Sequence, residues 1–460
     1  MSLERIQGLF ERFRREIAAS TTPDAPPITL PRVLALELFE SMLLARHLDR
    51  VAHELRASGH GHYTICSSGH EANVVLGRLT TPEDPSLVHY RSAALQVERA
   101  RRVPEIDPIA DIVLSLVASS EEPASGGRHK VFGNRRLGII PQTSTIASHL
   151  PRAVGLAFAL ERKARLGLAP AKDSIVLVSF GDASINHSTA LGAFNAAGWV
   201  AHQNLPCPVL FACEDNGLGI SVRTPPGWVR ARLEALPHVR YFEADGSDID
   251  ASFRAAERAI DYCRNTRRPA VLHSSCVRLL GHAGSDVDTS YRSPQELEEA
   301  AERDPLRRCA LSLLAAEYAS PAELLELDRR TGERVDAARE RAKQSPRLTS
   351  RGAVMSALAR SIDPRANSSL AKRAPGNDRL TLAQGINRAL TEMLSEQPEA
   401  LVFGEDVAKK GGVYGVTKGL LDRFGPTRVF NTLLDEQTIL GLALGASTLG
   451  LLPIAEIQYL

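Results

Sequence analysis

The sequence lacks several features that would place it in a specialised class of protein. Its 55 basic and 54 acidic side chains leave a net charge of +1, so no overall field attracts nucleic acid or an acidic membrane. The six cysteines include no CxxC pair, and a chain of 460 residues needs no disulfide framework. We therefore expect reduced, buried thiols in a cytoplasmic protein. Hydrophobic residues at 43% and charged residues at 24% exclude a disordered or collagen-like chain.

No secretory signal and no membrane span are expected. The first 20 residues are charged throughout, and Ile6, Phe10 and Phe13 recur among them at helical spacing, which predicts an amphipathic helix. The uncharged run 437–455 is nearly long enough to cross a bilayer, but its glycines, proline, serine and threonine lower its apolar content. We predict a helix followed by a buried strand there.

Strand and helix patterns alternate through the middle of the chain. The continuous apolar run 175–180 is typical of a strand that is covered on both faces. Residues 185–200 are alanine-rich and suit a helix, the run 208–213 predicts a second buried strand, and 268–280 resembles a third. This order predicts an α/β fold whose mostly parallel sheet is flanked by helices.

A change of composition near residue 360 marks the best domain boundary. Residues 361–379 are rich in proline, asparagine, serine and basic side chains, and a new helix and strand pattern follows. We predict a first domain at 1–330, a helical and polar linker at 331–378, and the first part of a second, similar domain at 379–460, which we expect to be truncated.

Two polar side chains follow the first two predicted strands. In open α/β sheets ligands bind beyond the carboxyl ends of strands, where Asp182 and Asn216 are expected. Their separation, 216 − 182 = 34 residues, allows one strand–helix–strand crossover. Glycines on both sides of Leu218 let its carbonyl turn inward, and Mg²⁺ with a phosphate group suits this set of oxygens. The alternative is an aspartate helix cap and an unrelated asparagine turn.

These residues lie in the segments GDAS and EDNGLGIS, which together resemble the signature of thiamine diphosphate enzymes. ARHLDRVAHEL, YTICSSGHEA, VHYRSA, TSTIASHLPRAVGLAFAL and RLLGHAGSDVDTSYR resemble the alpha-type subunit of the decarboxylating component of 2-oxo acid dehydrogenase complexes. Residues 379–460 resemble the start of the partner beta-type subunit, through ALVFGEDVAKKGGVYGVTKGLLDRFGPTRVFNTLLDEQ and LPIAEIQY. The resemblance covers about 35–300 and 379–460, and it implies an alpha–beta fusion with a beta-type part about one quarter complete.

The resemblance implies a metal and diphosphate site in the alpha-type domain. Asp182, Asn216 and the carbonyl of Leu218 match the Mg²⁺ ligands. The positions matched to the diphosphate are Gly181, Ala183, Ser184 and the pair Tyr90 and Arg91, whose planar cation suits that anion.

The resemblance also implies positions around the reacting end of the cofactor. Ser144 and Ile146 match positions that contact the aminopyrimidine ring through their backbone. His282 matches the loop histidine near the reacting carbons, where a side chain that titrates near pH 7 can exchange protons. Glu436 matches the beta-type glutamate that hydrogen-bonds the aminopyrimidine and favours its imino tautomer.

Three positions depart from the family pattern. Ala183 replaces the usual third glycine of the turn, and its methyl group requires a negative φ. His89 stands where a glutamine often precedes Tyr-Arg. Ala283 stands where mitochondrial relatives carry a phosphorylated serine, so we expect no such control here.

Single residues keep simpler interpretations. Glu436 has the alternative of an ordinary acid at a helix N-terminus, His282 that of a loop histidine bonded to Asp286, and Arg91 that of a surface ion pair. We interpret His62, His70 and His89 as structural, and His60 with His62 has no cysteine or carboxylate to complete a metal set.

The implied function is oxidative decarboxylation of a 2-oxo acid with acyl transfer to a lipoyl carrier. The implied cofactors are thiamine diphosphate and Mg²⁺. The implied partners are a lipoylated acyltransferase component and a second copy of the fused chain, without nucleic acid or membrane. The branched-chain type is slightly nearer than the pyruvate type, and the individual acid is not determined. The alternatives are a transketolase-like two-carbon transfer and an inactive cofactor-binding fragment.

Overall fold

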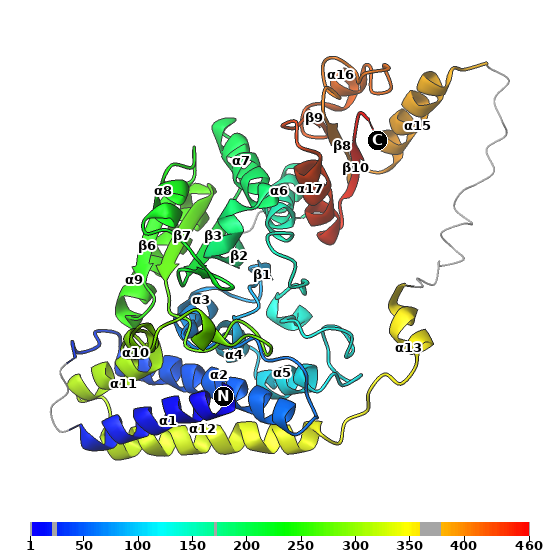
Figure 1. Cartoon of the computed structure of the whole chain (residues 1–460). Coiled ribbons are helices and arrows are strands. Elements are labelled where there is room, and N and C mark those ends of the chain that lie inside the picture. The colour runs from blue at the N-terminus through cyan, green and yellow to red at the C-terminus, as the bar shows by residue number, and fades with distance from the viewer. Residues whose placement is uncertain (1, 21–24, 170–172, 359–378, 460) are drawn as a thin grey trace.

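The computed structural model describes residues 2–20, 25–169, 173–358 and 379–459 (Figure 1). All but the last residue of the segment 361–379, where the sequence predicts a boundary, lies outside these ranges. The confirmed fold class is α/β, because parallel sheets in both halves of the chain are flanked by helices.

The larger sheet has five parallel strands in the order β1-β2-β3-β7-β6. Their bounds are β1 (Ser86–Leu87), β2 (Val176–Gly181), β3 (Val209–Asp215), β6 (Arg240–Asp245) and β7 (Ala270–Ser275). All three strands predicted in this region are present as β2, β3 and β7. The apolar run of β2 has no polar face because helices cover both of its sides.

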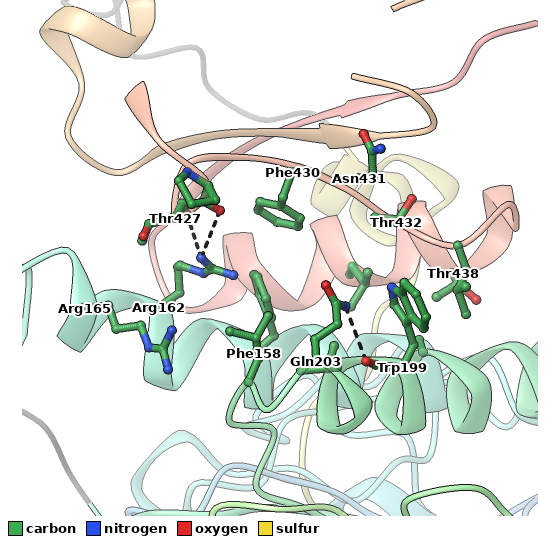
Figure 2. A pocket seen from close by; sticks show the side chains of 16 residues that line it. Phe158, Arg162, Arg165, Trp199, Gln203, Thr427, Phe430, Asn431, Thr432 and Thr438 are labelled. Atoms are coloured by element: carbon green, nitrogen blue, oxygen red, sulfur yellow. Dashed lines mark hydrogen bonds between the residues drawn. The ribbon is translucent and has the colours of Figure 1, made fainter. Parts of the chain in front are cut away.

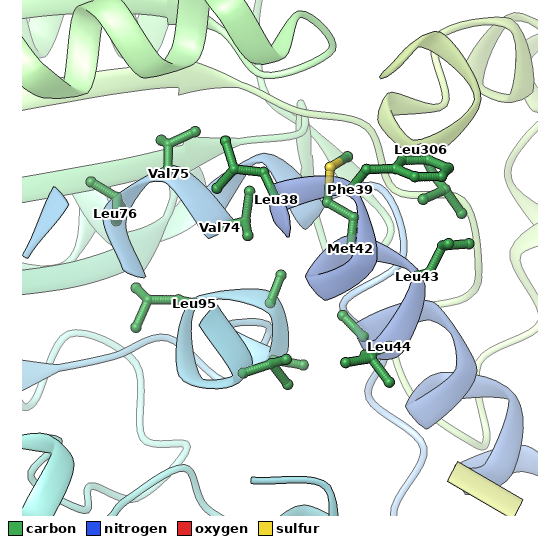
Figure 3. Packing of buried hydrophobic residues seen from close by; sticks show 14 of the residues in the cluster. Leu38, Phe39, Met42, Leu43, Leu44, Val74, Val75, Leu76, Leu95 and Leu306 are labelled. Carbon is green, nitrogen blue, oxygen red and sulfur yellow. The ribbon is translucent and has the colours of Figure 1, made fainter. Parts of the chain in front are cut away.

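Alternate side chains of β2 pack into two separate hydrophobic clusters. Val176, Val178 and Phe180 pack against α6 (Leu150–Arg165) and α7 (Ser188–His202). Leu177 points to the opposite face, toward the cluster built on α2 (Arg32–Ala57), α3 (Val74–Leu79), α4 (Ala93–Ala100) and α9 (Ile249–Thr266). Figure 3 shows Leu38 and Met42 of α2 near Val74 and Leu95 in this second cluster.

Two long helices cover the base of the molecule. The predicted N-terminal helix is α1 (Ser2–Ala19), and Ile6, Phe10 and Phe13 are buried as its spacing requires. It lies beside α12 (Pro321–Ala342) (Figure 1). Since α12 continues through residue 330 and buries Val335 and Ala338 in the main core, this part of the expected polar linker is half-buried. The boundaries at 330 and 378 stay predictions.

Shorter elements complete the first part of the chain. They are η1 (Glu71–Asn73), α5 (Pro108–Leu116), η2 (Arg135–Leu137), η3 (Asp182–Asn186), β4 (Leu218–Gly219), β5 (Val222–Arg223), α8 (Trp228–Glu234), η4 (Asp288–Ser290), α10 (Pro294–Glu302), α11 (Pro305–Ala315), α13 (Arg351–Met355) and η5 (Ser356–Leu358).

The C-terminal part forms a second parallel sheet, in the order β10-β8-β9. Its elements are α15 (Leu382–Glu396), β8 (Ala400–Gly404), α16 (Leu420–Phe424), β9 (Val429–Asn431), α17 (Glu436–Thr448) and β10 (Leu452–Glu456). The run 437–455 is thus a helix and a strand, as predicted. The expected burial of that strand is wrong, because among the described strands β10 pairs only with β8, at the sheet edge, and Leu452 is 41% exposed. Among the described helices, none combines the length and apolar character that a bilayer crossing requires.

Glycines bring α17 against α6 (Figure 1). A Cβ atom on Gly445 would overlap the Arg152 carbonyl oxygen and approach the Leu156 nitrogen, and one on Gly441 would overlap Pro151. The two helix backbones therefore touch where these glycines lie, and Ile439 enters the same core as β2.

A cavity of about 280 Å³ lies next to this crossing, between α6, α7 and residues 426–433 (Figure 2). Figure 2 shows that Phe158 and Phe430 line it. Their ring centroids are 5.2 Å apart. The Arg162 guanidinium closes one side by donating to the carbonyl oxygens of Pro426 (3.5 Å) and Thr427 (2.9 Å). The C-terminal part is thus attached to α6 by both glycine contact and hydrogen bonds.

We predict that Gly445→Ala destabilises the protein by roughly 1–3 kcal/mol, because the new methyl group overpacks the α6–α17 contact. Gly385→Ala is the matched control, since a Cβ atom there meets nothing within 4 Å and removing a helical glycine stabilises by about 0.5–1 kcal/mol. Urea denaturation of both variants measures whether each substitution lowers or raises the free energy of unfolding. Equal effects would contradict the close approach of the helices.

Candidate functional site

The ends of β2 and β3 bring Asp182 and Asn216 to the same edge of the sheet. Gly181 pairs with Glu214 across the two strands, so Asp182 lies opposite Asp215 and Asn216 follows one residue later. The Asp182 side chain is 2% exposed and accepts a hydrogen bond from the Thr224 hydroxyl. Burial raises the pKa of this carboxyl group. A bound cation would compensate that burial, so the carboxylate suits a metal ligand.

The loop after β3 carries the other two oxygens of the predicted metal site, those of Asn216 and Leu218. Gly217 has a φ of +73°, and it turns the chain into the β4–β5 hairpin that begins at Leu218. The Asn216 Oδ1 atom lies 3.2 Å from the Leu218 nitrogen, which donates to it. Carboxylate, amide and carbonyl oxygens are the ligands that Mg²⁺ takes, so these three residues fit the metal that the sequence implies.

Ala183 fits the turn beside Asp182. It begins η3 with Asp182 and is absent from the described residues with positive φ, as its methyl group requires. A Cβ atom on Gly219 would lie 3.0 Å from the Ala183 Cβ atom, so the hairpin glycine makes the room that the turn residue takes up. Gly181 is half-buried, and Ser184 is buried in the same turn.

Arg91 and His282 come together from distant segments. The Arg91 side chain is buried and donates to the Cys66 carbonyl oxygen, and its Nη2 atom lies 3.3 Å from His282 Nδ1. Among the described residues it has no carboxylate within salt-bridge distance, which argues against the surface ion pair. A buried guanidinium without an acidic partner suits an anionic ligand such as a diphosphate. The Tyr90 ring meets His282 edge-on, with centroids 6.2 Å apart.

The loop of His282 is tied down through its backbone. The His282 N–H donates to Asp286 Oδ2 at 2.5 Å, and the Tyr291 hydroxyl donates to the same oxygen at 2.5 Å. Asp286 thus bonds His282, as the simpler interpretation holds, and does so through the backbone N–H of the histidine. Burial, with Arg91 and Arg278 nearby, lowers the pKa of His282 to about 4. The imidazole is therefore neutral at pH 7 in this structure.

The two positions predicted to contact the aminopyrimidine lie in the loop before α6. Ile146 is 40% exposed, and the Ser144 hydroxyl lies 3.5 Å from the Tyr63 hydroxyl. Ala147 has a φ of +62°, a conformation that non-glycine residues rarely adopt, and it sharpens this turn. The exposed side chain of Ile146 is thus available to a ligand.

Glu436 is the first residue of α17 and is exposed. Its neighbour Gln437 accepts a 2.7 Å hydrogen bond from Thr189, at the start of α7, and Gly441 abuts Pro151 at the start of α6. The start of α17 therefore lies beside the first turn of α7, which follows Asp182, and the first turn of α6, which follows Ile146. The charge of Glu436 also contributes to raising the pKa of Glu405, after the larger effect of burial.

A buried group that the sequence did not predict lies next to Asn216. The His70 Nδ1 atom lies 2.6 Å from Glu214 Oε2, and the Asn216 Nδ2 atom lies 3.1 Å from His70 Nε2. Together with His89, this histidine and glutamate place three possible metal-ligand atoms within 4.8 Å of one another. Only Glu214, two residues before Asn216, carried a local signal, since His70 is far away in sequence.

The cysteines behave as predicted. All six are free and buried in the described structure, and burial raises the pKa of each thiol for which a shift is resolved: Cys66, Cys207, Cys213, Cys263, Cys276 and Cys309. Such thiols are unreactive at pH 7 and supply no nucleophile to the site.

Comparison with known proteins gives two family matches along the chain. Residues 39–351 match the model described as dehydrogenase E1 component, and residues 378–460 match the model described as transketolase, pyrimidine binding domain. These matches confirm the two resemblances that the sequence motifs indicated.

Individual relatives follow the same division. The 2-oxoisovalerate dehydrogenase subunit alpha of Bacillus subtilis is 30% identical over 283 residues, covering 59% of this chain and 79% of that protein. The mitochondrial 2-oxoisovalerate dehydrogenase subunit alpha 2 of Arabidopsis thaliana is 27% identical over 284 residues, covering 60% of this chain and 56% of that protein. The 3-methyl-2-oxobutanoate dehydrogenase subunit beta of Mycobacterium tuberculosis is 50% identical over 80 residues, covering 17% of this chain and 23% of that protein.

His149 gives the site region a predicted pH dependence. Its Nε2 donates to the Ser179 carbonyl of β2 at 2.9 Å, and burial lowers its pKa to about 4. In the unfolded chain His149 takes up a proton near pH 6.5, whereas in the folded chain it does so only near pH 4. Its contribution to the free energy of unfolding is therefore complete above pH 6.5 and is lost between pH 6.5 and about 4. His149→Gln keeps a donor without a titrating ring. We expect this variant to lose less of its free energy of unfolding in acid than the wild type does, by an amount on the order of 3 kcal/mol.

Urea denaturation at pH 7.5 and pH 4.5 measures this effect in the wild type and in His149→Gln. If the free energy of unfolding changed between the two pH values by the same amount in both proteins, His149 would have to be protonated at pH 4.5 in the folded protein as well.

Proposed function

Because the chain belongs to the dehydrogenase E1 component family, we propose that it binds thiamine diphosphate with Mg²⁺ and catalyses the oxidative decarboxylation of a 2-oxo acid. We further propose that the acyl product passes to a lipoyl carrier. The observation that carries the proposal is the placement of Asp182 and Asn216 at the ends of adjacent parallel strands. The buried guanidinium of Arg91, which has no carboxylate partner among the described residues, lies in the same domain.

In this proposal Asp182, Asn216 and the carbonyl of Leu218 hold the metal. Arg91 and Tyr90 bind the diphosphate together with the turn Gly181, Ala183 and Ser184. The burial of Asp182, Arg91 and Ser184 and the three-residue turn support these roles. The cofactor, when bound, supplies a carbon nucleophile that adds to the 2-oxo carbon and permits the loss of carbon dioxide.

The remaining residues act at the reacting end. Ser144 and Ile146 support the aminopyrimidine ring, Glu436 hydrogen-bonds it, and neutral His282 is placed to accept or return a proton. A pKa of about 4 favours the acceptor role in the free protein, and a nearby anionic ligand would raise that pKa. The adjacency of α17 to the starts of α6 and α7 supports a site built jointly by the alpha-type and beta-type parts.

We propose a branched-chain 2-oxo acid as the substrate class. The relatives named above are dehydrogenases of 2-oxoisovalerate and 3-methyl-2-oxobutanoate, and they match both parts of the chain. The chain spans 56% of the Arabidopsis alpha subunit and 23% of the mycobacterial beta subunit, so activity, substrate and partners all stay proposals.

The proposed partners are a lipoylated acyltransferase component and a second copy of this chain, in the cytoplasm. Exposed leucines support further assembly: Leu440 and Leu444 are 51% and 60% exposed, on the same face of α17 as Glu436. We also propose a division of the chain into three parts: an alpha-type domain at 1–330, a linker at 331–378 and a partial beta-type domain at 379–460.

Calorimetry with thiamine diphosphate tests the cofactor site. We expect the wild type to bind it only with Mg²⁺, and Asp182→Ala to weaken binding by at least tenfold, because one charged ligand is lost. Asp111→Ala is the control, since Asp111 is another half-buried carboxyl group with a raised pKa, placed on α5. Unchanged binding in Asp182→Ala would contradict the site.

Glu436→Gln tests the contribution of α17. We expect this variant to bind the cofactor while reduction of an artificial electron acceptor, driven by a branched-chain 2-oxo acid, falls by about 10²-fold. Glu396→Gln on the exposed face of α15 should leave the rate unchanged. Turnover with a ketose donor alone would instead indicate two-carbon transfer, and cofactor binding without any turnover in the wild type would indicate an inactive protein.

A further inference from the structure

His70 and Glu214 form a hydrogen-bonded chain that ends on the Asn216 side chain. His70 is fully buried and Glu214 is 3% exposed. The Glu214 Oε2 atom lies 2.6 Å from His70 Nδ1, and His70 Nε2 lies 3.1 Å from Asn216 Nδ2. Both ring nitrogens of His70 therefore have a partner.

The chemistry of these groups fixes the direction of each hydrogen bond. In the 2.6 Å contact with Glu214 the carboxylate oxygen is the acceptor, so the Nδ1–H group of His70 is the donor. Nε2 faces the Nδ2 atom of Asn216 at 3.1 Å, which carries only N–H donors, so Nε2 accepts from the amide. The Leu218 N–H donates to the other end of the amide, Asn216 Oδ1, at 3.2 Å, which agrees with this orientation.

We propose that Glu214 and His70 are positioning residues that hold the amide oxygen of Asn216 toward the metal. The proposal rests on the proposed function, because it requires Asn216 to be a Mg²⁺ ligand. An amide side chain has two ends of opposite polarity. Without an acceptor at its nitrogen, rotation by half a turn would present an NH₂ group to the cation. The outer partners of metal ligands commonly orient them in this way.

The same side chains also invite a competing interpretation. His70, His89 and Glu214 have ligand atoms within 4.8 Å of one another, and the Nδ1 atom of His89 has no hydrogen-bond partner within the described structure. A metal ion on this set would have to displace the 2.6 Å contact between His70 and Glu214. The short contact and the double engagement of His70 favour the positioning role.

His70→Leu and His70→Gln separate packing from hydrogen bonding. Gln has both an acceptor for Asn216 and a donor for Glu214, whereas Leu has neither. His47→Leu is the matched control, because His47 is also a buried histidine bonded to a carboxylate, that of Asp328 at 2.9 Å, and is described without contact to Asn216.

Two measurements test the proposal. In a titration of Mg²⁺ at fixed thiamine diphosphate, we expect His70→Leu to need 10–100-fold more Mg²⁺ for half-saturation, while His70→Gln and His47→Leu stay close to the wild type. In ¹H–¹⁵N correlation spectra of the cofactor-free wild type, the signals that disappear in His70→Gln should show a ring whose hydrogen is on Nδ1 and not on Nε2.

Opposite results would overturn the proposal. Wild-type Mg²⁺ dependence in a folded His70→Leu, or a His70 ring protonated at Nε2, would reject the positioning role while leaving the cofactor site intact. Stoichiometric Co²⁺ binding that requires His70, His89 and Glu214 would replace it by a metal site. Absence of cofactor binding in the wild type would instead reject the proposed function, and the spectrum would still decide the direction of the hydrogen bonds.

Discussion

The parallel pairing of β2 with β3 is the constraint on which the candidate site depends. Both strands are covered by helices on two faces, so their register is fixed by burial along their whole length. That register sets Asp182 and Asn216 at one edge, where each chain leaves the sheet. A shift of one residue would turn the apolar side chains of β2 to the wrong faces and separate the two polar groups. Core packing and the placement of the candidate metal ligands therefore have the same cause.

A second constraint joins the two parts of the chain. The glycines at 155, 441 and 445 allow α6 and α17 to meet backbone to backbone, and the hydrophobic core of the larger sheet continues through Ile439 and Phe403 into the smaller sheet. Because α17 begins at Glu436, this contact decides where that carboxylate lies relative to the loops before α6 and α7. The family matches divide the chain into two units, but packing makes the start of α17 part of the surroundings of one site.

Much of this arrangement could be predicted because its signals are local. The apolar runs gave β2, β3 and β7 without any knowledge of their neighbours, and the residues that follow them, Asp182 and Asn216, could be placed at one edge from topology alone. The turn at Ala183 also followed the expected backbone. These predictions need only the period of the side chains and the rule that parallel strands end on the same side.

Other features depend on contacts between distant residues, and their local signals were weak or absent. His70 and Glu214 are 144 residues apart, so sequence spacing gave no reason to pair them. The half-buried state of β10 depends on its place at the sheet edge, and the burial of Val335 depends on the packing of α12 against α2. The roles of Ser144, Ile146 and Glu436 came from family resemblance. The structure supplies their surroundings and a reason to test them.

The most direct test of the central claim is an anomalous-scattering experiment on crystals grown with thiamine diphosphate and Mn²⁺ in place of Mg²⁺. The account predicts one strong peak about 2.1 Å from oxygens of Asp182, Asn216 and Leu218, with the diphosphate completing the coordination. A peak among His70, His89 and Glu214, or an ordered cofactor with no metal at the ends of β2 and β3, would contradict it.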